Sequence, residues 1–417
     1  MPEPQFDHRQ APDEPLKRAY LQTRQLTEAL AAPLSDADAT LQSMEDASPA
    51  KWHLAHTTWF FETFLLRDRL PDYRLFDADW PFLFNSYYEA EGERIGRFAR
   101  GMLSRPTLDE IRDYRAHVDE AMSPLLDDPA HADLVALGIA HEQQHQELLL
   151  TDIKHALFQN PLGPAMWPGG EAQTMNRVEA QWRPHPGGIA LLGHDGSGFS
   201  YDNEGPRHRV LLEPFALRSA LVTNAEWEAF IADGGYRDAR LWLSDGWAWV
   251  QTEKIAQPLY WREDVQFTHA GWQARDGEAP VTHISYYEAD AFATWAGARL
   301  PTEFEWEAAA RSGSGADFAP DGGNQMDEAA PPLPTGGTAM FGDCWQFTRS
   351  AYLPYPRYEA PEGAVGEYNG KFMSGQVVLR GASCATARGH SRASYRNFFY
   401  PHQRWQFTGL RLAKDIP

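Results

Sequence analysis

The stretch 131-HADLVALGIAHEQQHQELLLTDIKHALFQ-159 has a helical pattern and carries two histidines four residues apart, His141 and His145. Residues four apart lie on one face of an α-helix, so both imidazoles can bind the same ion. Leu148 to Leu150 follow directly and indicate that the helix is largely buried. Buried histidines need partners, because an unpaired buried polar group is costly. The stretch therefore predicts a helix that carries part of a metal site.

Three segments upstream have similar helical patterns: residues 15–34, 48–66 and 107–126. Ser48 and Pro49 are the expected N-cap and first helical residue of the second segment. Thr107 and Glu110, three residues apart, predict a capping box at the start of the third. Together with 131–159, these segments predict a four-helix bundle within residues 10–160, with a long connection over roughly 68–106.

The pattern changes after the bundle. Residues 161–185 are rich in Pro and Gly and are interpreted as a linker. Residues 186–417 are interpreted as a second domain of mixed α and β structure with much irregular chain. Strands are expected in 187–195, 208–224 and 375–384, and helices in 223–235, 285–298 and 301–313. The fold class predicted for the chain is α+β multidomain.

Composition excludes several classes of protein. The chain has 37 basic and 58 acidic residues, a formal net charge of −21, whereas nucleic-acid binders present a basic face. The polar, Pro-rich start lacks the apolar core of a signal peptide, and no run of 18 apolar residues predicts a membrane span. Cys344 and Cys384 are the only cysteines, so no disulfide framework is expected. We expect a soluble, cytoplasmic protein.

A third ligand for the site would have to come from another helix. The motif 52-WHLAH-56 offers His53 or His56, and spacing alone leaves both open. Glu142 and Glu147 are possible carboxylate ligands, although their spacing from the histidines turns them toward other faces. Imidazole suits Zn, Fe, Cu and Ni. The alternative is that His141 and His145 lie on a solvated helix face; the spacing also lacks the Glu of the H-E-x-x-H motif of metalloproteases.

The motifs "WHLAH", "HEQQHQEL", "NSYYEAEG", "RLPTEFEWEAAAR" and "SYRNFFYPHQRWQFTGLRLA" together resemble the sulfoxide synthases of ergothioneine biosynthesis. The resemblance runs from about residue 15 to 414. It implies a DinB-like helical bundle followed by a domain related to formylglycine-generating enzymes and C-type lectins. The closely spaced reactive cysteine pair of formylglycine-generating enzymes is missing, because Cys344 and Cys384 lie 40 residues apart, so that activity is not expected.

The resemblance also implies a chemistry. Nonheme Fe(II) would be held by His56, His141 and His145, with His53 as a neighbour. Three neutral histidines leave open positions for a thiolate and for O2. The expected reaction joins a thiol sulfur to the imidazole C2 of hercynine (Nα-trimethylhistidine) and oxidises that sulfur. It needs no flavin, nicotinamide or keto acid, because the two oxidations supply the four electrons that O2 accepts.

Further site residues are expected, some from the same resemblance and others from the chemistry of their side chains. The expected proton or hydrogen-atom donor is at least one of Tyr87 and Tyr88, since adjacent residues rarely both face one site, and Tyr368 is the alternative. The substrate-binding residues expected for hercynine are Gln144, Asn397, Phe398 and Phe399, whose aromatic faces suit a trimethylammonium group. Arg94, Arg97 and Arg100 are candidates for the carboxylate of the sulfur donor, or are simply solvated.

The sulfur donor is the open question. In family members that use γ-glutamylcysteine an acidic residue stands where this chain has Phe399, which favours cysteine here, or a selenosugar as in selenoneine synthases. An ovothiol-type enzyme acting on histidine is a further alternative. A zinc-dependent thiol transferase and a binding protein with a degenerate site are rivals from other classes. The regiochemistry at the imidazole and the oligomeric state, including a homo-oligomer, stay open.

Overall fold

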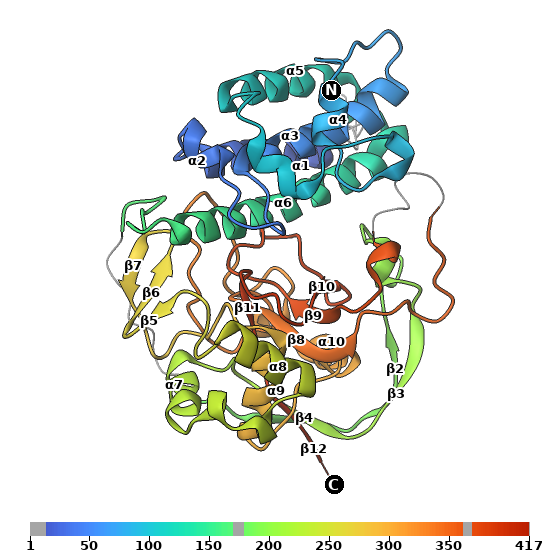
Figure 1. Cartoon of the computed structure of the whole chain (residues 1–417). Helices are drawn as coiled ribbons and strands as arrows, with labels where there is room; N and C mark the ends of the chain where they lie inside the picture. Colours follow the sequence, from blue (N-terminus) through green and yellow to red (C-terminus); the bar gives the residue numbers. More distant parts are fainter. Residues whose placement is uncertain (1–13, 170–178, 362–368, 417) are drawn as a thin grey trace, which may run out of the picture.

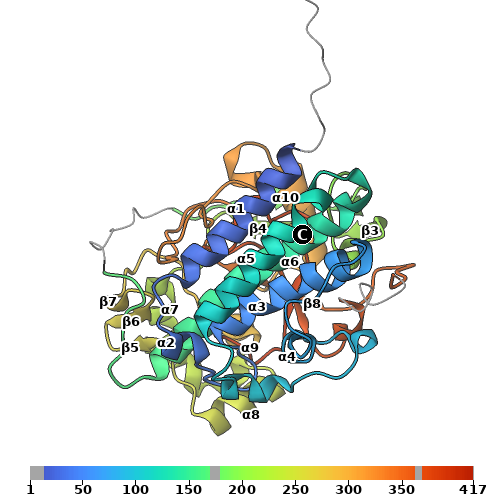
Figure 2. The same ribbon diagram turned by 90° about the horizontal axis from the view of Figure 1, so that it is seen from above.

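The computed structural model describes residues 14–169, 179–361 and 369–416, in which a layer of helices lies across a larger mixed domain (Figure 1). The helical layer contains the four helices expected from the sequence: α1 Glu14–Ala31, α3 Ala50–Phe61, α5 Leu108–Leu126 and α6 Ala132–Gln159. A π-helical turn, Glu62–Arg67, extends α3. Seen from above, the four helices lie alongside one another (Figure 2), which confirms the predicted bundle.

Local sequence explains most helix starts. The Thr107 side chain accepts a hydrogen bond from the Glu110 amide, and the Glu110 carboxylate accepts one from the Thr107 amide, so the predicted capping box is confirmed. The cap predicted for α3 is wrong by one residue, because Pro49 is the N-cap and Ser48 lies outside the helix. Ser48 is used elsewhere: its N–H donates to Asp152 and its hydroxyl accepts from Arg100.

The connection between α3 and α5 is partly ordered by short helices. These are α4, Trp80–Phe84, and the 3-10 turns Glu89–Glu91 and Arg97–Met102. A further short helix, α2 Asp36–Thr40, lies between α1 and α3. Every residue of α3 is buried, so it is the central helix and packs against α1, α5 and α6. A side chain at Gly138 of α6 would overlap the ring of Phe61, which shows how closely α6 approaches α3.

The second domain is built on small sheets flanked by helices. A four-stranded sheet has the order β10-β9-β8-β11, with β8 Trp345–Ala351, β9 Val377–Gly381, β10 Asn397–Phe399 and β11 Thr408–Gly409. The other strands are β1 Trp182–His185, β4 Phe215–Arg218 and β12 Ala413–Asp415 in one sheet, the pair β2 Gly188–Leu192 and β3 His208–Leu212, and the meander β5 Trp261–Arg262, β6 Val265–Thr268 and β7 Gly271–Ala274. The helices are α7 Asn224–Ala232, α8 Ser244–Glu253, α9 Tyr286–Trp295 and α10 Glu303–Ser312.

The linker predicted for 161–185 is wrong at its end. Residues 182–185 form β1, which pairs with β4 in the register Trp182↔Arg218 and so belongs to the second domain. Residues 170–178 of the expected linker lie outside the described residues, as do residues 10–13 of the expected bundle. The three predicted helices of this domain are confirmed as α7, α9 and α10, each with a capping box.

Helix α6 forms the boundary between the two layers (Figure 1). Its Glu147 accepts hydrogen bonds from Trp345, Ser383 and Thr386, and its Lys154 ammonium lies 2.8 Å from Nε2 of His283. Buried polar contacts of this kind hold the second domain against the helix that carries the two histidines. No helix in the described part of the chain is long and apolar enough to cross a membrane.

Candidate metal centre

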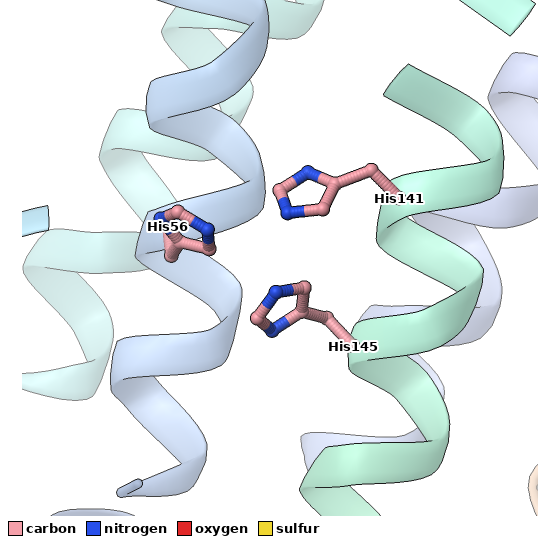
Figure 3. A group of neighbouring side chains, drawn as sticks. All are labelled: His56, His141 and His145. Atoms are coloured by element: carbon pink, nitrogen blue, oxygen red, sulfur yellow. The ribbon is translucent and has the colours of Figure 1, made fainter. Parts of the chain in front are cut away.

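Three histidines converge between α3 and α6. His56 extends from α3, and His141 and His145 extend from successive turns of α6 toward it (Figure 3). One ligand atom of each lies within 4.8 Å of the others. His56 is also clamped between two indoles, with ring centres 4.6 Å from Trp52 and 5.5 Å from Trp59. The rings therefore surround one small space.

The surroundings keep these imidazoles neutral. Burial lowers the pKa of His141 to about 3. Burial, and then the nearby His141, lower the pKa values of His56 and His145 well below the ordinary value. A neutral imidazole offers a lone pair, which is the form that binds a metal ion.

Hydrogen bonding decides which nitrogen of His56 is available. Nδ1 of His56 lies 2.6 Å from the carbonyl oxygen of Phe84, the last residue of α4. A carbonyl only accepts, so Nδ1 carries the proton and Nε2 carries the lone pair. Nε2 is buried and has no hydrogen-bond partner among the described residues. A buried lone pair facing two other imidazoles is what a metal ligand requires, so the three residues fit a metal ion.

The carboxylates near the histidines are committed to other contacts. Glu142 lies between Arg24 and Arg115, 2.8 Å from each. Its burial raises the pKa of Glu142, but the two arginines outweigh this and lower it to about 2. Glu147 is held by three donors of the second domain. The described residues thus leave a site of three histidines, without either glutamate.

A cavity of about 510 Å³ lies beside the centre, between the helices and the second domain. His145 is the member of the trio that lines it. Of the residues predicted to bind substrate or act in catalysis, the following line the cavity: Tyr87, Arg97, Arg100, Gln144, Asn397, Phe398 and Phe399. Arg94 and Tyr88 are not part of its wall.

The two adjacent tyrosines face different surroundings. Tyr88 is fully buried, with ring centres 5.5 Å from Trp59 and 5.3 Å from Phe64. Tyr87 is half-buried at the cavity and packs edge-on against Phe372 of the second domain. Tyr368, the alternative, lies outside the described residues. These positions favour Tyr87 as the member of the pair at the site, and its catalytic role stays a prediction.

The three arginines also differ. Arg94 pairs with Glu89 at 2.5 Å, away from the cavity, and Arg97 is exposed at its edge. Arg100 is buried on the cavity wall, where it donates to the hydroxyls of Ser48 and Ser86. Burial lowers the pKa of Arg100. Among the described residues, no carboxylate lies within salt-bridge distance of Arg100, so its guanidinium is available to an anion in the cavity; spacing did not distinguish it from Arg94 and Arg97.

The expected hercynine-binding residues come from both layers. Nε2 of Gln144 donates to the Tyr395 hydroxyl at 2.7 Å, and Phe398 stacks on Tyr352 with ring centres 4.1 Å apart. Sequence patterns did not point to Tyr395 or Asp152, which also line the cavity, and offered His53 only as a possible ligand or a neighbour of the metal site. The only sequence signal for His53 was its place in the "WHLAH" motif.

The two layers match two known families. The model of the DinB superfamily matches residues 19–149, and that of the sulfatase-modifying factor enzyme 1-like domain matches residues 183–333. A DinB-like bundle with a histidine trio, joined to a formylglycine-generating-enzyme-like domain, is thus the class of protein. The formylglycine-generating enzyme of Thermomonospora curvata is 37% identical over 150 residues, 31% of this chain and 48% of its own.

Longer matches identify the family. Hercynine oxygenase of Mycolicibacterium thermoresistibile is 34% identical over 422 residues, covering 91% of this chain and 90% of its own. Hercynine oxygenase of Mycolicibacterium smegmatis is 36% identical over 410 residues, covering 88% of this chain and 91% of its own. The chain belongs to the hercynine oxygenase family, which agrees with the resemblance found in the sequence motifs.

Proposed function

We propose that this protein is an O2-dependent sulfoxide synthase that joins a thiol sulfur to the imidazole C2 of hercynine, with Fe(II) held by His56, His141 and His145. The observation that carries the proposal is the trio of neutral imidazoles beside an interdomain cavity. Family membership supports the substrate, because the long matches are hercynine oxygenases.

The reaction balances without a further reductant. Hercynine, a thiol and O2 yield the sulfoxide and one water: the C–H and S–H bonds are replaced by a C–S bond, and the sulfur gains one oxygen. A ferrous ion at the three histidines would supply the electron transfer that activates O2 and a positive centre that attracts a thiolate. The chain's own contribution is to bring the imidazole and the sulfur together, which removes most of the entropic barrier.

The cavity wall suits a zwitterionic imidazole compound. Gln144 and Asn397 provide neutral hydrogen-bonding groups on the wall of the cavity that His145 also lines, while Phe398 and Phe399 provide aromatic faces for a trimethylammonium group. Tyr87 is proposed as the proton or hydrogen-atom donor, because its ring is at the cavity whereas that of Tyr88 packs in the core.

The donor is proposed to be cysteine rather than γ-glutamylcysteine. Arg100 and Arg97 line the cavity and suit a carboxylate, and Asp46 on the same wall suits an ammonium group. At position 399, where γ-glutamylcysteine users carry an acidic residue, the chain has Phe399, which lines the cavity. A small zwitterionic amino acid matches these charges. A selenosugar, which has neither charge, is the alternative that the test distinguishes.

The test is reconstitution under anaerobic conditions with Fe(II), followed by addition of O2 and hercynine with cysteine, γ-glutamylcysteine or a selenosugar separately. We expect the hercynine–cysteine sulfoxide by mass, with O2 consumed in equal amount. Zn(II)-loaded protein is the matched control. Product formation with Zn(II) and no uptake of O2 would contradict the proposal, as would a product from histidine and none from hercynine.

A further inference from the structure

A fourth histidine, His53, lies beside the trio and is within hydrogen-bond distance of one of its members. Nδ1 of His53 lies 2.8 Å from Nδ1 of His145, and Nε2 of His53 lies 3.1 Å from Oδ2 of Asp152. His53 and Asp152 are both buried. The three side chains form one line, from a carboxylate through an imidazole to the imidazole that borders the cavity.

The direction of the hydrogen bonds follows from the far end of this line. Asp152 accepts from the backbone N–H of Ser48 at 2.8 Å and from the indole N–H of Trp405 at 2.9 Å, and neither group can accept in return. The carboxylate is therefore an acceptor, and His53 donates to it from Nε2. With its proton on Nε2, His53 has a lone pair on Nδ1 that can accept the proton on Nδ1 of His145, and this arrangement leaves the lone pair of His145 on Nε2.

We propose that His53 and Asp152 are positioning residues of the metal centre, which hold His145 in the tautomer and ring orientation that present Nε2 to the ion. The inference rests on the proposed metal site and deepens it. A metal-bound histidine usually donates its other N–H to a carboxylate or carbonyl, which fixes the ring. His56 does so directly through Phe84, whereas His145 does so through His53.

The hydrogen-bonded residues around Asp152 come from both the helical layer and the second domain. Asp152 belongs to α6, Ser48 precedes α3, and Trp405 belongs to the second domain. Docking of the second domain thus supplies one of the donors that orient Asp152. A fourth-ligand role for His53 does not fit this arrangement, because both of its ring nitrogens are already used in hydrogen bonds.

The affinity for Fe(II), measured by anaerobic titration, tests the proposal apart from catalysis. We expect H53A to lower the affinity about 10- to 100-fold, the usual effect of losing such a partner. We expect D152N also to lower the affinity for Fe(II). W405F should lower it less, because Trp405 contacts Asp152 and not a histidine. The matched control is H155A: His155 is a buried histidine on α6 that bonds to the Ser43 hydroxyl at 2.7 Å and should leave the affinity unchanged.

The outcomes separate this inference from the proposed function. Wild-type protein that binds no Fe(II) would overturn the metal site itself. Wild-type binding together with an H53A affinity within about twofold of it, or equal losses in H53A and H155A, would overturn only the role of His53. If H53A does not fold, ¹⁵N NMR of Zn(II)-loaded wild-type protein decides: we expect a proton on Nδ1 of His145 and metal on Nε2, and metal on Nδ1 would overturn the proposal.

Discussion

The guanidinium carbon of Arg100 lies 3.4 Å from the centre of the Trp52 ring, on the wall of the cavity beside the histidines. The indole holds the cation where, among the described residues, no carboxylate reaches it. Placing a buried cation this way is costly unless an anion arrives. The pair therefore marks the expected position of a substrate carboxylate.

If Arg100 binds the donor carboxylate, R100Q removes charge-assisted hydrogen bonds worth about 1.5–3 kcal/mol, or roughly 10- to 100-fold in affinity. We expect KM for cysteine to rise by about that factor, with KM for hercynine little changed, in steady-state O2 consumption. R94Q is the control, because Arg94 pairs with Glu89 outside the cavity. Equal effects of the two substitutions would refute the assignment.

Removing one histidine should abolish the metal site without unfolding the chain. We expect H141A to lose bound iron, measured on protein reconstituted and desalted anaerobically. Fe(II) at about a hundred times its Kd should stabilise the wild type by about 2.7 kcal/mol and H141A not at all. His131, the N-cap of the same helix, provides the control substitution H131A. Iron retained in full by H141A would rule out the ligand assignment.

The neighbouring tyrosines should separate catalysis from packing. Y87F removes the hydroxyl at the cavity, and we expect kcat for sulfoxide formation to fall by about 10²- to 10⁴-fold, the usual contribution of a proton donor. Y88F should leave kcat nearly unchanged, because Tyr88 packs on Trp59 and Phe64. Rapid-quench measurement of product resolves the two. A large loss in Y88F alone would reverse the proposed roles.

Lys154 should make stability depend on pH. Burial lowers the pKa of this lysine to about 7, whereas an unfolded lysine titrates near its ordinary value of 10.5. Between these pH values the unfolded chain binds the proton and the folded chain does not, so stability rises with pH. The free energy of unfolding of wild type minus that of K154M should rise by up to about 1.4 kcal/mol per pH unit from pH 7 to 10.

Urea unfolding of the wild type and of K154M at pH 6, 7, 8 and 9 measures this difference in free energy of unfolding. Subtracting the two values cancels the contributions of groups that titrate alike in both proteins. Below pH 7 it should be flat, since Lys154 is then protonated in both states. A difference that is constant across the whole range would show that Lys154 keeps its ordinary pKa in the folded protein.

Local signals predicted the helices well for a physical reason. A capping box joins residues three apart, so Thr107 with Glu110 is visible in the chain itself. Ser48 failed as a cap because residues far away in sequence use its polar groups. Strand β1 was missed because its partner, β4, lies more than thirty residues downstream and nothing in 182–185 marks the pairing.

Some residues of the candidate site were likewise predictable from the sequence, and others were not. Helical periodicity placed His141 and His145 on one face, and the motif resemblance nominated His56, Gln144 and Asn397. Periodicity could not separate Tyr87 from Tyr88, or Arg94 from Arg97 and Arg100. All of these lie in the connection before α5, where the chain has only short helical turns and no long periodic pattern from which side-chain direction could be predicted.

The sequence by itself determined the helices, the pair of histidines on one helix face and the family, because each depends on residues close together in the chain or on an ordered set of motifs. Tertiary structure alone decided that Tyr87 rather than Tyr88 reaches the cavity, that Arg100 is the buried cation, and that Asp152 orients His145 through His53. These relationships arise where α3, α6 and the second domain meet, and contacts between segments so distant in sequence are set by packing.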